Sequence, residues 1–201
     1  MDKYLNLNDL QKMFIRKQLI NSVTYTLVIA SIVKVLYENF DSDMLMLRDY
    51  LFTAPSLLIA IGFIRKLIKD NPIMCYRIKG IISVGGCGML VIVELVGGSP
   101  MWYFADALIV SFIPLLTNPH RAYYSSYVAD KSKDFSEVMG YTDVFGEVSR
   151  VILGLSLIYL DIKILYVLIV VLIMDAIERY YDNVIANVVF SEKELITEEV
   201  H

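Results

Sequence analysis

The chain has few of the residues that build metal centres and covalent cross-links. Its 201 residues include only two cysteines, Cys75 and Cys87, and two histidines. The cysteine spacing matches no zinc motif, and we expect both thiols to be reduced rather than joined in a disulfide. The sequence also has no evident serine–histidine–acid or His/Glu constellation. We therefore predict no metal, no cofactor and no enzymatic activity.

Basic charge is not in excess either. Eighteen Lys and Arg residues stand against 22 Asp and Glu residues, which gives a formal net charge of −4. Nucleic-acid binding needs a basic surface, so this balance argues against DNA or RNA as a partner.

Apolar residues, in contrast, are abundant. They make up 57% of the chain, and the mean hydropathy is +0.57. A soluble domain averages nearer to about 45–50% apolar. Because the hydrophobic runs recur along the whole length, we predict an all-α, polytopic membrane helix bundle.

Six apolar segments have a length close to that of a bilayer-spanning helix. They lie at residues 19–38, 49–67, 79–97, 101–117, 142–160 and 162–181. Residues 1–18 form a polar, cytoplasmic lead-in with amphipathic spacing, and residues 182–201 form an acidic cytoplasmic tail. The lead-in is either a helix on the membrane surface or a segment packed on the bundle, and we do not expect it to be a cleaved signal peptide.

The distribution of Lys and Arg predicts the orientation. If the N-terminus is cytoplasmic, 14 of the 18 basic residues fall in cytoplasmic segments. The positive-inside rule therefore places both termini in the cytoplasm of a multi-pass cell-membrane protein. The polar run that contains Asn118 and Arg121 is then predicted to be part of a cytoplasmic hairpin between two spans.

Six charged residues fall inside the predicted spans, where a charge is costly and should face the bundle interior. They are Lys34, Glu94, Asp106, Glu147, Arg150 and Asp175. Their depths permit an outer pair of Lys34 with Asp106 or Glu94, and an inner cluster of Glu147, Arg150 and Asp175. These groups either line a substrate or proton pathway or form structural ion pairs that set helix register.

The chain resembles one half of a major facilitator superfamily transporter in its six spans, its cytoplasmic termini and its charged loop after the fourth span. Residues 55–66 and 118–122, followed by 128–130, 139–140 and 149–154, are similar to motifs of the branch related to macrolide exporters. The resemblance implies that spans 1 and 4 line a cavity, and hence that Lys34 and Asp106 contact substrate or proton.

The sequence also departs from that family. Lys66 stands where the loop after span 2 usually has an acid, Leu155 follows Gly154 in place of proline, and the six spans match only half of a transporter. We therefore predict a half-transporter that exports a small amphipathic molecule after pairing with itself or with another six-span half. The alternative is a non-transporting accessory or immunity protein derived from a transporter.

Overall fold

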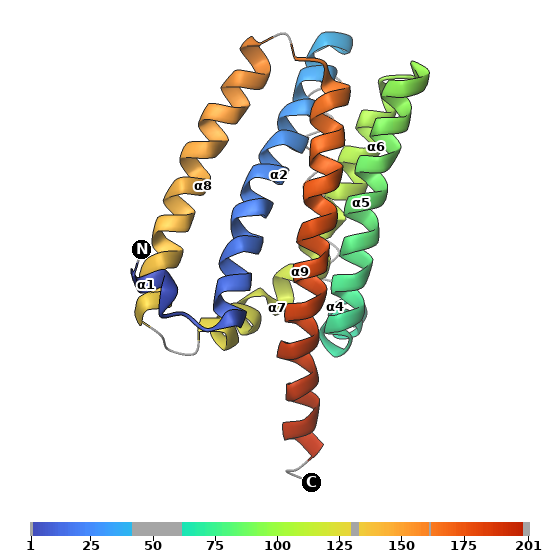
Figure 1. Ribbon diagram of the computed structural model, residues 1–201. Helices are drawn as coiled ribbons and strands as arrows, with labels where there is room; N and C mark the ends of the chain where they lie inside the picture. The colour runs from blue at the N-terminus through green and yellow to red at the C-terminus, as the bar shows by residue number, and fades with distance from the viewer. Residues whose placement is uncertain (1, 42–61, 130–132, 161, 199–201) are drawn as a thin grey trace.

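The computed structural model describes residues 2–41, 62–129, 133–160 and 162–198 (Figure 1). Within these ranges the regular elements are all helices, as the sequence predicts. They are α1 Asp2–Leu5, α2 Asp9–Asn39, α4 Gly62–Asp70, α5 Pro72–Val96, α6 Met101–Val110, α7 Phe112–Ala129, α8 Lys133–Tyr159 and α9 Ile164–Glu198.

Local sequence signals explain several helix ends. Asn8 caps α2 through its side chain, which accepts a hydrogen bond from the Gln11 amide, while the Gln11 side chain accepts one from the Asn8 amide. This reciprocal pair is a capping box. Pro72 starts α5, and Gly97 ends it in the left-handed conformation with φ 65°. Glycine is favoured at that position because it has no Cβ to clash.

In the described part of the chain, three helical stretches are long and apolar enough to cross a membrane: Asp9–Asn39, Pro72–Val96 and Met101–Asn118. The third runs across the junction between α6 and α7. Helices α8 and α9 have a suitable length, but each carries three charges within an otherwise apolar stretch. The all-helical class is therefore confirmed, while the count of six spans stays a prediction.

The long helices run side by side (Figure 1). Helix α2 packs against α8 and α9, and α5 packs against α9, α6 and α7. Among the described residues, two large apolar clusters fill most of the bundle, and a small third one contains Ile68, Cys75 and Leu115. One large cluster contains Ile32, Leu36, Leu90, Tyr103 and Leu168. The other lies toward the opposite end and includes Phe14, Tyr76, Tyr124, Val128 and Phe190.

The structure places several helix boundaries differently from the sequence prediction. Asn118 and Arg121 lie inside α7, which continues to Ala129, and so they are not in a loop. The reason is tertiary packing, since Tyr124 and Val128 of the same helix are buried in the second cluster. Likewise, α9 continues without a break to Glu198, through most of the predicted 182–201 tail. The predicted 49–67 span lies outside the described residues except for its last part, which begins α4.

Candidate functional site

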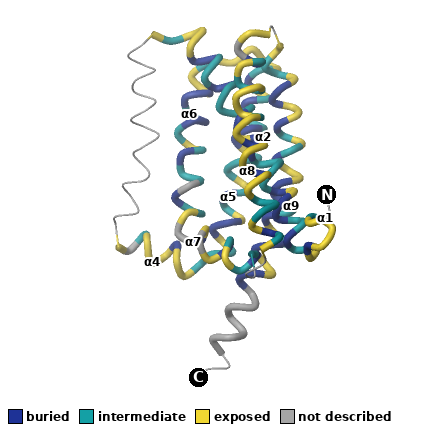
Figure 2. Tube along the Cα trace, turned by 90° about the vertical axis from the view of Figure 1, so that its left-hand side faces the viewer, coloured by how far each residue is buried: buried dark blue, intermediate teal, exposed yellow. Residues whose placement is uncertain are grey.

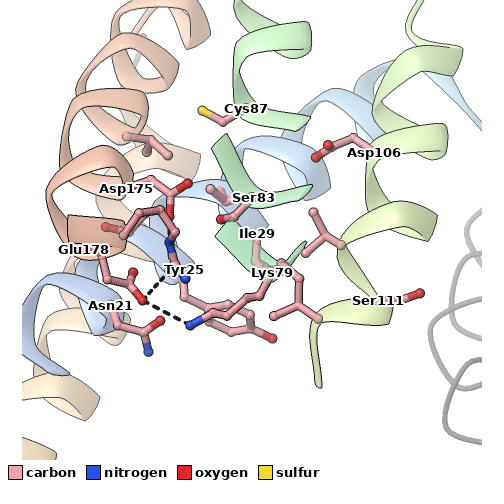
Figure 3. Close-up of a pocket in the computed structure, with 16 residues that line it drawn as sticks. Asn21, Tyr25, Ile29, Lys79, Ser83, Cys87, Asp106, Ser111, Asp175 and Glu178 are labelled. Atoms are coloured by element: carbon pink, nitrogen blue, oxygen red, sulfur yellow. Dashed lines mark hydrogen bonds and ion pairs between the residues drawn. The ribbon is translucent and has the colours of Figure 1, made fainter. Parts of the chain in front are cut away.

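A cavity of about 160 Å³ lies inside the bundle, between the two apolar clusters (Figure 3). Helices α2, α5, α6, α7 and α9 all contribute to its wall. On α2, for example, the lining residues fall between Phe14 of one cluster and Ile32 of the other. The polar and charged part of the wall includes Asn21, Thr24, Lys79, Ser83, Asp106, Asp175, Glu178 and Arg179.

Two carboxylates belong to the wall of the upper part of this cavity. Asp106 projects from α6 and Asp175 from α9, with Ser83 and Cys87 of α5 between them (Figure 3). The two aspartates are only 1% and 2% exposed, respectively. Asp106 Oδ1 and Asp175 Oδ2 have no hydrogen-bond partner among the described residues. Buried polar atoms are usually satisfied, so two unsatisfied acceptors in one cavity indicate a place for a donor.

An ion-pair network borders one end of the cavity. Asp182 is its centre: its carboxylate lies 3.0 Å from Lys17 Nζ, 2.7 Å from Lys79 Nζ and 2.6 Å from an Arg179 nitrogen. Glu178 pairs with Lys79 and Arg179. Since these residues come from α2, α5 and α9, the network ties three helices together at one level.

The network also reaches into the cavity wall. The second nitrogen of the Arg179 guanidinium lies 3.4 Å from Asp175 Oδ1. Asp175 therefore has one carboxylate oxygen paired with a cation and one left for another partner. Asp106 has no ion pair in the part of the chain that the structure describes.

The network changes the ionisation of groups beyond the predicted spans. Burial alone would raise the pKa of the Asp182 carboxyl, yet Lys17, Lys79 and Arg179 together hold that pKa well below its ordinary value. Burial, together with the negative charge of Asp182, raises the pKa of the nearby Tyr124 hydroxyl. Asp182 is therefore ionised and Tyr124 neutral at physiological pH.

The predicted outer pair does not form. Lys34 Nζ donates a hydrogen bond to the Leu157 carbonyl at 3.3 Å, and Glu94 accepts one from the Tyr103 hydroxyl at 2.7 Å. Both residues lie outside the cavity wall, and Asp106 meets neither of them. Depth alone does not specify which face of a helix a residue occupies, and the packing of α2 turns Lys34 toward α8.

The predicted inner cluster forms only in part. Glu147 and Arg150 pair with each other at 2.6 Å, and their side chains are 68% and 41% exposed. Asp175 instead pairs with Arg179 within α9. The face of α8 that carries Glu147 and Arg150 points away from the bundle, because α8 contacts α2 through its other side. The exposed Asn118 and Arg121 of α7 likewise do not line the cavity.

Sequence reasoning missed most of the network. Lys17 falls in the predicted lead-in, Lys79 at the first position of a predicted span and Asp182 at the start of the predicted tail, where charges are expected and carry little information. One signal could have revealed it. Residues 175, 178, 179 and 182 are all charged and recur at helical spacing, which places four charges on a single face of α9.

Comparison with protein-family models, curated proteins and solved structures gives no significant match. Function is therefore inferred from the geometry of the site.

Proposed function

We propose that the chain is an integral membrane protein that binds a small molecule in the central cavity and moves it across the bilayer. The observation that carries this proposal is the cavity itself, which is lined by charged residues and formed by α9 together with the three helical stretches that are long and apolar enough to cross a membrane. Ionisable groups are expensive to keep at membrane depth, and where they face a cavity they commonly mark a pathway.

The proposed protein is half of a transporter of the major-facilitator type. In such proteins the substrate site lies near the midplane, at the interface between two repeats. A second copy of this chain or another six-span half would complete the pathway. The exposed apolar side chains of α8 suit contact with lipid or with such a half; they include Val144, Val148, Val151, Ile152 and Leu155.

A second candidate is a non-transporting accessory or immunity protein. The observation that favours it is the ion-pair network, which joins α2, α5 and α9 through buried contacts. If these ion pairs never break, the helices that they join cannot separate at that end of the cavity. A bound ligand could then leave only toward the other side of the membrane. Such a protein would act by binding another membrane protein or a membrane-active peptide.

Flux into proteoliposomes distinguishes the two candidates. The purified chain is reconstituted and tested with a panel of labelled small amphipathic cations, anions and neutral molecules, with and without a proton gradient. Transport predicts saturable uptake of at least one compound, strongly reduced by Asp175→Asn and retained by Asp143→Asn on the exposed surface of α8. Uptake equal to that of protein-free vesicles across the panel overturns the transport proposal.

Native mass spectrometry of the same preparation tests the half-transporter assignment. A symmetric dimer is expected if the chain pairs with itself. A monomer that nevertheless supports flux would contradict the need for a second half.

A further inference from the structure

We propose that the cavity binds a small organic monocation, namely a primary or secondary ammonium that carries an apolar group about the size of a benzene ring. Asp106 and Asp175 would hold the ammonium. This inference rests on the proposed function and specifies its substrate class. It can be tested by binding alone, independently of any flux.

Charge balance is the first argument for a cation. The three cations of the network, Lys17, Lys79 and Arg179, are matched by three acids, Asp175, Glu178 and Asp182. Asp106 adds a fourth acid to the cavity wall and has no ion-pair partner among the described residues. One negative charge is therefore uncompensated, and a single positive charge in the cavity would balance it.

Hydrogen-bond geometry is the second argument. Asp106 Oδ1 and Asp175 Oδ2 are buried acceptors without donors, and they belong to opposite walls (Figure 3). An ammonium group offers two or three N–H donors in divergent directions and no acceptor. Within the cavity it can therefore donate to carboxylates of the wall, with the Ser83 hydroxyl of α5 beside it. Hydrogen bonds between charged partners are the stronger kind.

The size and the apolar walls of the cavity select an organic ligand. Val28, Ile29, Val110 and Val171 line the remaining space. The volume of about 160 Å³ is similar to that of an engineered cavity of about 150 Å³ that holds benzene in another protein. A hard metal ion would need about six or more oxygen ligands, and no group of three potential metal ligands occurs among the described residues.

A proton is the competing occupant. An unpaired buried carboxylate can become neutral by taking up a proton. In that case Asp106 would need no cation, and a neutral ligand would bind as well as a charged one. The comparison between matched charged and neutral ligands therefore decides between the two.

Isothermal titration calorimetry on the full chain in mild detergent at pH 7 provides the test. The probes are benzylammonium, its neutral analogue benzyl alcohol, benzoate and sodium chloride. We expect saturable binding of one benzylammonium per chain, and affinity for benzyl alcohol weaker by about 10- to 100-fold. Equal affinity for the neutral analogue overturns the proposal, and so does sodium binding without benzylammonium binding.

Variants then locate the site. Asp106→Asn should weaken benzylammonium binding by about 10- to 100-fold, while Asp143→Asn, the same change on an exposed helix face, should leave it unchanged. If Asp106→Asn does not fold, Val110→Phe fills the cavity without altering any charge and should also abolish binding. Unchanged binding in either folded cavity variant contradicts the assigned site.

The outcomes of the binding and flux experiments are independent. Saturable benzylammonium binding without uptake of any compound would refute transport and retain the site. Uptake of an anion without any benzylammonium binding would retain transport and refute the site.

Discussion

The carboxylate of Asp106 lies directly against the backbone of Gly86, so that a Cβ atom at Gly86 would stand 2.2 Å from Oδ1. No real Cβ tolerates such a distance, and the position therefore requires glycine unless the carboxylate moves. This contact lets α6 approach α5 closely and brings Asp106 to the cavity wall. The preceding residue, Gly85, has open space where its Cβ would be.

Gly86→Ala should displace the Asp106 carboxylate and destabilise the bundle by about 1–3 kcal/mol, the usual cost of overpacking a filled site. Thermal unfolding in detergent measures the loss of stability, and calorimetry with benzylammonium measures the loss of binding. Gly85→Ala is the matched control and should change neither property. Equal behaviour of the two variants would contradict the described packing of Asp106.

Asp182→Ala should be among the most damaging single changes in the chain. It leaves Lys17, Lys79 and Arg179 buried without their shared partner. Breaking a buried pair in this way costs about 3–5 kcal/mol, which should appear as a large fall in the detergent melting temperature.

Glu147→Ala is the comparison for Asp182→Ala, because its ion pair with Arg150 is exposed. Exposed pairs contribute about 0–1 kcal/mol, and the melting temperature should therefore change little. A similar fall in both variants would mean that the buried position of the network has no special importance.

Gly146 allows α8 to pack on α2. A Cβ at this position would lie 2.6 Å from the Ser22 hydroxyl oxygen, whereas a Cβ at Gly154 meets nothing within 4 Å. Gly146→Ala should therefore lower thermal stability or loosen α8, as measured by proteolysis in detergent. Gly154→Ala should behave like the wild type, although both glycines fall in the same predicted span. Equal sensitivity of the two positions would refute the described α2–α8 contact.

The two ends of α8 should lie on opposite sides of the membrane. Lys163, which follows α8, and Lys133, its first residue, are both exposed and lie at opposite ends of this helix (Figure 1). Lys163→Cys should react with an impermeant maleimide on intact cells, and Lys133→Cys only after permeabilisation. The native Cys75 and Cys87 are buried and provide an unlabelled background. Labelling of both variants from one side would refute α8 as a span.

The burial pattern distinguishes α8 from the other long helices (Figure 2). Most of its residues beyond Val144 are exposed, whereas α9 alternates buried and exposed positions along its length. Both helices have similar apolar character in the sequence. Only the arrangement in space makes α9 central and α8 peripheral.

The sequence by itself determined the all-helical class and the membrane-length apolar stretches, because both depend on composition and on runs of neighbouring residues. It also predicted that six charges face the interior, and of these Asp106 and Asp175 are buried in the structure. It could not determine their partners, since depth along a helix leaves its rotation open. Tertiary structure decided that Lys34 meets a carbonyl, that Glu147 and Arg150 face outward, and that Lys17, Lys79 and Asp182 meet in one buried network. These outcomes depend on which helices pack together, and residues more than 100 positions apart carry no local signal of their contact.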